Sequence, residues 1–262
     1  VTIFEKTAQV GGQLVAGSNM RIKHDVARYL RNLQSQMDQL NRDGLEIKYN
    51  TAVKSEDLKG NFDVIICATG LKPVVPEIEG KDQINSIEAR ALLLNGMKLP
   101  DGVQKVTVIG GGVVGCEVAY SLAAERGVEV TVVEMLPNLM TGTVHANRSM
   151  LLWMMMGKGA PSGKQGDALQ NSIAAFTSSK VVRFLPGKVV IMANRKRKDP
   201  YTPWTTLIPE NIHNPFDRPL NPKDVEEIVL DTDFVVYATG GRADDELYYE
   251  LLKQNAAPEV YC

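Results

Sequence analysis

Cysteine is scarce in this sequence: its 262 residues include three, Cys67, Cys116 and Cys262, which are far apart and odd in number. A disulfide framework is therefore not expected, and this cysteine usage favours a reducing compartment, so we expect a cytoplasmic protein. Three cysteines are too few to ligate an iron–sulfur cluster. The sequence also lacks a C-x-x-C or C-x₄-C pair, so we expect no thiol–disulfide reductase activity.

Long apolar runs and an excess of one charge are also missing. The longest strongly apolar run without glycine covers residues 150–156, far short of the roughly 20 residues that a membrane-spanning helix needs. The 29 Lys and Arg nearly balance the 31 Asp and Glu, so we expect no general attraction to nucleic acids or to a membrane surface. The histidines His24, His145 and His213 are isolated, and no metal site is predicted.

An initiator methionine and a signal-peptide pattern are absent at the start of the chain. Val1 instead opens an alternating β-prone run that continues to Lys6. We therefore expect the chain to be a segment of a longer protein.

What is present is the composition of a folded protein. The chain is 44% hydrophobic and 23% charged, with 22 Gly and 13 Pro. These values exclude disorder, collagen and a coiled coil, and the length suits one large or two modest domains.

Residue periodicity predicts alternating strands and helices. An amphipathic helix is expected between an N-cap at Asp25 and a stop at Gly44. The continuous apolar run at residues 63–67 predicts a fully buried strand. Residues 105–134 read as strand, glycine turn, helix and strand, which predicts a parallel βαβ unit. Further expected segments are a strand at 45–49, an apolar helix at 147–156 that packs in a core or interface, a hairpin at 180–193 that turns at Pro186-Gly187, a proline-rich surface excursion at 194–224 and a strand at 228–237.

The glycine turn fits the G-x-G-x-x-G pattern of dinucleotide-binding proteins. It follows a strand, opens a helix and precedes Glu134 by 19 residues. In this pattern the first glycine permits a tight turn, the second lets a pyrophosphate approach, and the third allows close helix packing. The pyrophosphate lies at the helix N-terminus, where N–H groups and the helix dipole favour negative charge. The motif consists of Gly110, Gly111, Gly112, Val113, Val114 and Gly115.

Glu134 is expected to accept hydrogen bonds from the adenosine ribose of the nucleotide. A carboxylate there repels a 2′-phosphate, and the following Met135 and Leu136 offer no arginine to reverse this, so NADH is favoured over NADPH. The alternative interpretation is an ordinary glycine turn in an α/β core.

A weak internal repeat accompanies the motif. Two apolar strands, each led by an aspartate, end at Cys67 and at Tyr237, and both are followed by Ala-Thr-Gly. In addition, the run Val-Thr-Ile-Phe-Glu that ends at Glu5 parallels the run Val-Thr-Val-Val-Glu that ends at Glu134. The repeat predicts two similar nucleotide-binding modules. Glu5 alone could equally be a charged strand end.

Taken together, these motifs resemble the two-dinucleotide-binding flavoproteins related to glutathione reductase. Within them the chain is most similar to the C-terminal half of 2-enoate and 2,4-dienoyl-CoA reductases, the Old Yellow Enzyme-like NADH:flavin oxidoreductases. The resemblance implies an α/β fold: a Rossmann-like parallel sheet with helices on its faces, in an NAD domain inserted into an incomplete FAD domain. It implies a partial FAD domain at 1–100, an NAD(H) domain at 101–238 and a return to the FAD domain at 239–262.

The resemblance also implies roles for individual residues. Glu117 matches a position that points toward the nicotinamide. The family's FAD pyrophosphate loop would lie before Val1 and its Gly-Asp pair after Cys262, so we expect flavin binding by residues 1–262 to be incomplete. The other matches are Glu5 and Lys6 at the FAD ribose, Gly12 and Gln13 beside the flavin nucleotide, Val53 at the adenine, and two interdomain crossings at Ala68, Thr69 and Gly70 and at Ala238, Thr239, Gly240 and Gly241.

The implied function is transfer of hydride from NADH to flavin, which feeds an enoate or dienoyl-CoA reductase site elsewhere in a parent chain. That parent is expected to carry a flavin-barrel domain, with FMN and an iron–sulfur cluster as further cofactors, and a homo-oligomer is left open. The alternatives are a non-catalytic ADP- or NAD-binding module and an electron-transfer subunit. The basic run that begins at Arg195 and ends at Lys198 is expected to be a solvated turn, with a basic docking patch as the alternative.

Overall fold

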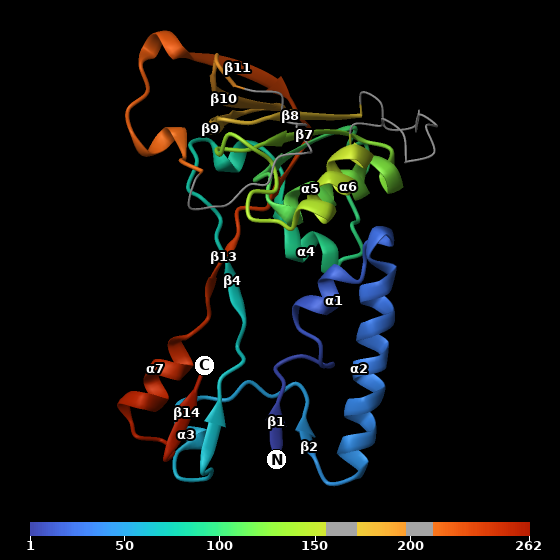
Figure 1. The fold of residues 1–262 in the computed structure, drawn as a ribbon, viewed down its shortest axis with the longest axis vertical. Helices are drawn as coiled ribbons and strands as arrows, with labels where there is room; N and C mark the ends of the chain where they lie inside the picture. Colours follow the sequence, from blue (N-terminus) through green and yellow to red (C-terminus); the bar gives the residue numbers. More distant parts are fainter. Residues whose placement is uncertain (156–171, 198–211) are drawn as a thin grey trace. The chain divides into compact units, whose positions relative to one another are not determined.

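The computed structural model describes residues 1–155, 172–197 and 212–262, and the chain divides into two compact units (Figure 1). The terminal unit combines Val1–Val74 with Gly241–Cys262, and the central unit is Val75–Gly240. The division into an FAD domain at 1–100 and 239–262 and an NAD(H) domain at 101–238 stays a prediction.

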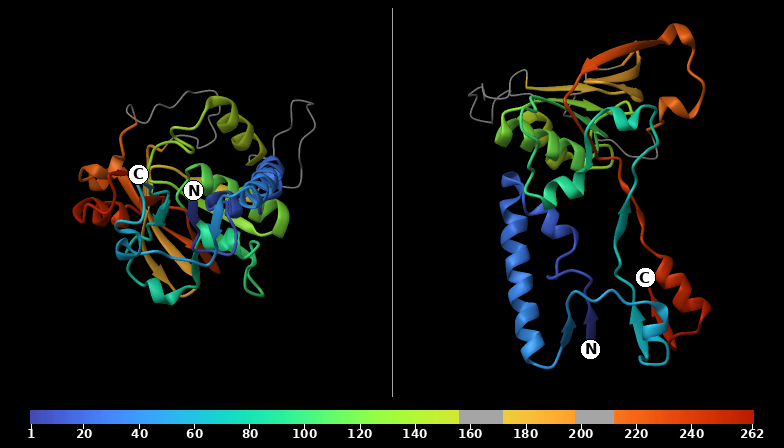
Figure 2. Two further views of the ribbon diagram at one scale, coloured as in Figure 1. Left: turned by 90° about the horizontal axis from the view of Figure 1, so that it is seen from below. Right: turned by 180° about the vertical axis from the view of Figure 1, so that it is seen from behind.

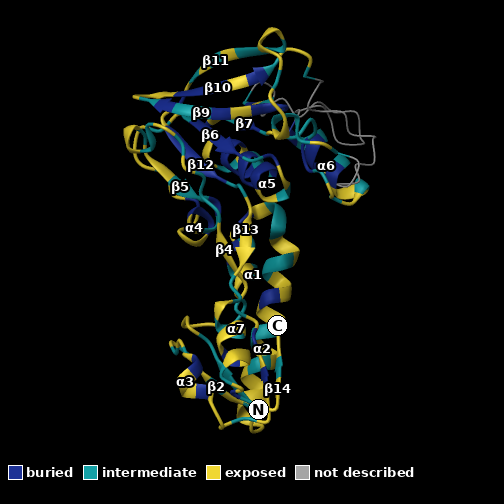
Figure 3. Ribbon diagram, turned by 90° about the vertical axis from the view of Figure 1, so that its left-hand side faces the viewer, coloured by how far each residue is buried: buried dark blue, intermediate teal, exposed yellow. Residues whose placement is uncertain are grey.

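The central unit is built on a five-stranded sheet in the order β5-β12-β6-β7-β8. All neighbours in it are parallel, and the middle strands are buried along most of their length (Figure 3). The predicted α/β class and the parallel βαβ unit are therefore confirmed. The strands are β5 (Ser86–Glu88), β6 (Lys105–Ile109), β7 (Glu129–Val133), β8 (Ile173–Phe176) and β12 (Phe234–Tyr237).

The two faces of this sheet have different coverings (Figures 1 and 2). Helices α4 (Ala89–Leu94) and α5 (Val113–Ser121) cover one face, and α6 (His145–Met155) packs on α5. An antiparallel sheet covers the other, a feature that the sequence did not indicate. Its strands are β9 (Ser179–Leu185), β10 (Lys188–Asn194) and β11 (Val225–Asp231), and the core between the sheets includes Ile109, Val133, Phe184, Ile191 and Val235.

Two predicted turns of the central unit are confirmed. The helix after the glycine loop continues through a π-helical turn, Leu122–Arg126, and ends at Gly127, whose φ is +69°. Strands β9 and β10 form the expected hairpin around Pro186-Gly187, with Gly187 at φ +68°. Glycine suits both ends because it adopts positive φ without a steric penalty.

The prediction of a single strand at 228–237 is wrong. The segment forms β11 and β12, which belong to different sheets. The break falls at Thr232 and Asp233, where the Asp233 carboxylate accepts hydrogen bonds from the backbone N–H groups of Gln104 (2.9 Å) and Lys105 (2.8 Å). These bonds hold the chain where it passes from the antiparallel to the parallel sheet.

The terminal unit contains three two-stranded sheets, one long α-helix and three short ones. Strand pairs β1·β2 and β3·β14 are parallel, and β4·β13 is antiparallel. The strands are β1 (Thr2–Phe4), β2 (Glu46–Lys48), β3 (Val64–Ile66), β4 (Leu71–Pro73), β13 (Gly241–Ala243) and β14 (Glu259–Tyr261), and the helices are α1 (Gln13–Gly17), α2 (His24–Arg42), α3 (Ser55–Leu58) and α7 (Glu246–Lys253).

The predicted cap of the long helix α2 is wrong, whereas its end is right. A 3₁₀ turn, Arg21–Lys23, leads directly into α2, so Lys23 occupies the N-cap position. Asp25 lies in the first turn, where its carboxylate pairs with Arg28 at 3.0 Å. Gly44 follows the helix with φ +108°.

The prediction that the strand at 63–67 is fully buried is also wrong. Ile65 is 9% exposed, whereas Val64 and Ile66 are 46% and 73% exposed. Only one face of β3 packs against a core, which includes Leu58 and Leu251. In the described part of the chain β3 pairs with β14 alone.

No helix in the described ranges is long and apolar enough to cross a bilayer.

Candidate functional site

The first and last glycines of the motif, one in the turn after β6 and one in the first turn of α5, are required by the backbone around them. Gly110 has φ +105°, and a Cβ on it would lie 2.4 Å from the carbonyl oxygen of Ala238. A Cβ on Gly115 would lie 1.9 Å from the carbonyl oxygen of Gly110. Side chains at either position would force the loop, the helix and the end of β12 apart.

Gly111 is also confined, by side chains rather than by backbone, which the motif alone did not reveal because its second position is variable. A Cβ there would lie 2.5 Å from Leu139 Cδ2 and 2.9 Å from the Glu134 Cβ. The carbonyl oxygen of Gly111 also accepts a 2.7 Å hydrogen bond from the N–H of Met140. The run of three consecutive glycines was the available signal.

Gly112 differs from its neighbours because the space around it is open. It is the N-cap residue of α5, with φ −69°, and nothing lies within 4 Å of where its Cβ would be. The first N–H groups of an α-helix have no acceptor within the helix, so they attract an anion at this end. The open space and these donors fit a pyrophosphate group.

Glu134 follows β7, and each of its carboxylate oxygens accepts a backbone hydrogen bond, one of them from the loop. Oε2 accepts a 2.5 Å hydrogen bond from the N–H of Gly111, and Oε1 accepts one of 2.7 Å from the N–H of Leu136. Burial raises the pKa of this carboxyl group, and the backbone donors oppose the rise. The carboxylate is thus placed at the loop, where an acceptor for ribose hydroxyls is expected.

Below the loop lie two buried groups. Cys116 is fully buried, its Sγ lies 3.4 Å from the carbonyl oxygen of Gly111, and burial raises the pKa of its thiol. Cys116 is therefore a packing residue of the core beside the glycine motif. Arg148, which sequence reasoning did not single out, is buried in α6, and its Nε donates to the carbonyl oxygen of Leu139 at 3.0 Å. It supports the segment that packs on Gly111.

The remaining candidates of the central unit lie on or beside this loop. Val113, Val114 and Glu117 belong to α5, and Val114 is 48% exposed. Met135 follows Glu134 and is 37% exposed. Their contacts with a nucleotide stay a prediction.

In the terminal unit, Glu5 follows β1 and organises the next turn. Its Oε1 accepts hydrogen bonds from the backbone N–H and the hydroxyl of Thr7, both 2.7 Å. Lys6 is exposed, and Gly12, with φ +49°, caps α1, which begins at Gln13. The predicted FAD contacts of these residues, and of Val53, stay a prediction.

The two Ala-Thr-Gly segments adopt similar backbone turns. Gly70 has φ +78° and Gly240 has φ +81°. The strands that follow them, β4 and β13, pair with each other, and Gly241 lies opposite Pro73. The Thr69 hydroxyl donates to the carbonyl oxygen of Asp244. The structure thus pairs the strand that follows one Ala-Thr-Gly segment with the strand that follows the other, although Ala68 and Ala238 are far apart in sequence.

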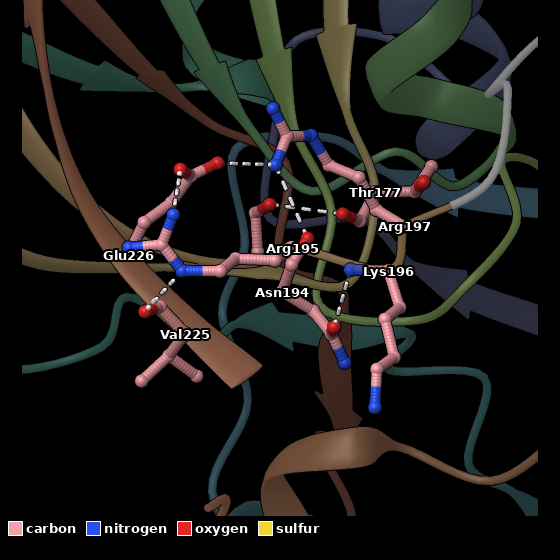
Figure 4. A network of polar contacts seen from close by, with 8 residues as sticks. Thr177, Asn194, Arg195, Lys196, Arg197, Val225 and Glu226 are labelled. Atoms are coloured by element: carbon pink, nitrogen blue, oxygen red, sulfur yellow. Dashed lines mark hydrogen bonds and ion pairs between the residues drawn. The ribbon is translucent and has the colours of Figure 1, made fainter. Parts of the chain in front are cut away.

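The basic run forms the expected turn at Arg195 and Lys196, whose side chains are exposed, while Lys198 lies outside the described residues; its side chains also form ion pairs. Glu226 accepts from Arg195 at 3.1 Å and from Arg197 at 2.8 Å (Figure 4), and Lys196 lies 2.8 Å from Asp224. The hydrogen bond from Arg197 lowers the pKa of Glu226. Acidic groups on β11 and in the 3₁₀ turn before it therefore offset this positive charge.

The chain is similar in sequence to several known proteins. The family described as pyridine nucleotide-disulphide oxidoreductase matches residues 3–160. An NADH oxidase of Thermoanaerobacter brockii is 32% identical over 74% of the chain and 30% of its own length. A cinnamate reductase of Clostridium sporogenes is 35% identical over 58% of the chain and 22% of its own length.

Among solved structures, a 2-naphthoyl-CoA reductase matches all of the chain and 32% of its own length. The TM-score is 0.72 and the identity 26%. A histamine dehydrogenase from Rhizobium sp. 4-9 matches the fold over 99% of the chain and 36% of its own length, with a TM-score of 0.64 and 16% identity. The chain thus spans about a third or less of the length of these proteins.

Proposed function

This chain belongs to the pyridine nucleotide-disulphide oxidoreductase family, and from this we propose that it acts in the transfer of hydride from NADH to FAD. The family implies FAD and NAD(P)H as cofactors. The chain contributes the NADH-binding region and part of the FAD-binding region of an FAD-dependent NADH oxidoreductase. The observation that carries the proposal is the glycine loop from Gly110 to Gly115, bound to the carboxylate of Glu134 by the Gly111 N–H.

The residues of the loop divide the task of holding NADH. Gly112 leaves room for the pyrophosphate, and the α5 N-terminus supplies N–H donors. Glu134 accepts from the ribose hydroxyls and disfavours a 2′-phosphate by charge repulsion. Glu117 lies on the nicotinamide side, and Glu5, Gly12 and the Ala68–Gly70 segment line the FAD region.

When bound, NADH supplies a hydride that FAD accepts. Such a transfer requires the two rings to be held about 3–3.5 Å apart and needs no acid or base from the protein. No catalytic side chain is therefore proposed. Since the sequence lacks a C-x-x-C or C-x₄-C pair, the reducing equivalents pass to a different acceptor.

We propose that this acceptor is a reductase site elsewhere in a longer chain, which acts on an enoate or an unsaturated acyl thioester. The names of the cinnamate reductase and the 2-naphthoyl-CoA reductase support this substrate class. FMN, an iron–sulfur cluster and a flavin-barrel domain belong to the same proposal, because the chain covers only part of the length of these relatives.

Anaerobic titration with NADH of the FAD-loaded longer protein tests this function. Bleaching of the yellow flavin absorbance at about one NADH per FAD supports it. Nucleotide binding without bleaching contradicts it and indicates a non-catalytic nucleotide-binding module. Calorimetry of the chain itself, with NADH and NADPH compared, separates the binding site from the later chemistry.

A further inference from the structure

Two cysteines that are 195 positions apart in sequence meet at the end of one strand pair in the terminal unit. In the parallel pair β3·β14, Val260 lies opposite Ile65 and Tyr261 opposite Ile66. The last bond of the ladder runs from the N–H of Cys67 to the carbonyl oxygen of Tyr261, at 2.8 Å, and completes the Tyr261–Ile66 pair. The same register, extended by one residue past this pair, brings Cys262 opposite Cys67.

Both thiols belong to the same face of this pair. Side chains alternate between the faces of a strand, and Ile66 and Tyr261, at 73% and 52% exposure, occupy the open face. Ile65, Cys67 and Val260 occupy the other face and join the Leu58 core. Cys262 follows Tyr261, so it shares the face of Cys67.

The two thiols differ in access to solvent. Cys67 is 7% exposed, Cys262 is exposed, and both are free thiols. Burial raises the pKa of the Cys67 thiol, and the negative charge of a Cys262 thiolate raises it further. Neighbouring strands lie about 4.8 Å apart, within the roughly 4.4–6.8 Å between Cα atoms that a disulfide spans.

We propose that Cys67 and Cys262 form a cross-strand dithiol site that closes to a disulfide when a low-molecular-weight disulfide, such as glutathione disulfide, is the oxidant. The exposed Cys262 thiolate attacks one sulfur of glutathione disulfide, forms a mixed disulfide and releases one glutathione thiolate. The Cys67 thiolate then attacks Cys262 Sγ and releases the second glutathione. Two protein thiols are oxidised and one glutathione disulfide is reduced to two thiols.

The geometry makes this disulfide a reversible one. Parallel strands are related nearly by translation, so the Cβ atoms of opposite residues are about as far apart as the strands, about 4.8 Å. Unstrained disulfides prefer a Cβ separation of about 3.8 Å, and strained ones are more easily reduced. Closure draws β14 toward β3 immediately before Ala68 and Thr69.

Peptide mapping after oxidation tests the site. The chain is incubated with glutathione disulfide, its remaining thiols are alkylated, and it is digested with trypsin without reduction. The expected product links residues 60–81 to residues 254–262, with a mass lower by two hydrogen atoms than the sum of the two peptides. The peptide of residues 106–126, which carries Cys116, remains alkylated and serves as the internal control.

Two cysteine variants and a comparison with the chain unfolded in urea serve as controls for the Cys67–Cys262 link. Cys116→Ala should retain the link, whereas Cys262→Ser, at an exposed position, should abolish it without disturbing the core. The link should form at least about ten times faster in the folded chain than in urea, because folding brings two distant segments together. A stable mixed disulfide at Cys262, a disulfide-linked dimer or equal rates in urea would each overturn the proposal.

Discussion

Glu134 Oε2 lies 2.5 Å from the backbone nitrogen of Gly111, which precedes it by 23 residues in sequence. The carboxylate at the end of β7 thus fixes the glycine loop at the end of β6 as well as standing where a ribose is expected. Its second oxygen is held by Leu136. One side chain therefore fixes the shape of the loop and, in the proposed function, also selects the nucleotide, and the two roles can be separated by experiment.

Replacement of Glu134 by glutamine should weaken NADH binding about tenfold, because a charged acceptor becomes a neutral one. NADPH binding should weaken less or improve, since the repulsion of the 2′-phosphate is removed. Calorimetric titration of both nucleotides gives the ratio of affinities. Glu129→Gln, at the other end of β7, is the matched control and should leave the ratio unchanged. An unaltered ratio in Glu134→Gln would refute the ribose assignment.

Two alanine substitutions in the loop should have opposite consequences. Gly115→Ala places a methyl group 1.9 Å from a backbone oxygen and should lower the free energy of unfolding by at least about 2 kcal/mol. Gly112→Ala meets nothing within 4 Å, so thermal stability should be retained while NADH affinity drops. Thermal unfolding and NADH titration of both variants provide the check. If Gly112→Ala binds NADH normally, the pyrophosphate does not approach this residue.

The raised pKa of Glu134 gives stability a defined pH dependence. The folded chain holds the Glu134 proton more tightly than the unfolded chain does, so the contribution is full below the unfolded pKa and is lost as pH rises through the folded pKa. The unfolding free energy of the native chain, relative to Glu134→Gln, should therefore fall across that interval. Denaturant unfolding of both proteins across acidic pH measures this. A difference that rises with pH would contradict the burial of Glu134.

The break between β11 and β12 should depend on Asp233. Asp233→Ala removes the acceptor of two backbone N–H groups before β6 and should cost about 1 kcal/mol, as the loss of a capping side chain does. Asp231→Ala, which removes only exposed ion pairs with Lys188 and Lys105, should be close to neutral. Urea denaturation compares the two. Equal effects would show that Asp233 does not hold the crossing.

The local sequence pattern predicted the structure correctly wherever the residues of a segment determine its conformation by themselves. The βαβ unit, the Pro186-Gly187 hairpin and the helix stop at Gly44 all depend on spacing and on glycine at positive φ. Pattern failed where distant segments decide. Apolar residues continue from β11 to β12, so the sequence concealed a break that is fixed by contacts with Gln104 and Lys105. The exposure of Ile66 depends on what packs against β3, which its own residues do not encode.

The candidate site shows the same division. The loop glycines and Glu134 were found because their spacing is fixed by one βαβ unit. Arg148 and the steric limit on Gly111 were missed because both depend on Leu139, in a segment with no motif. The pairing of Arg195 and Arg197 with Glu226 likewise joins residues about thirty positions apart, which charge patterning along the chain does not report.

The pairing of β4 with β13 has a consequence for how the central unit is connected. Its two ends leave the terminal unit from neighbouring ladder positions, since Pro73 lies opposite Gly241. A short turn from Val74 to Gly241 would therefore close the terminal unit without stretching either strand. The central unit is therefore connected as an insertion, and we expect that the corresponding unit of a relative can replace it at these two positions.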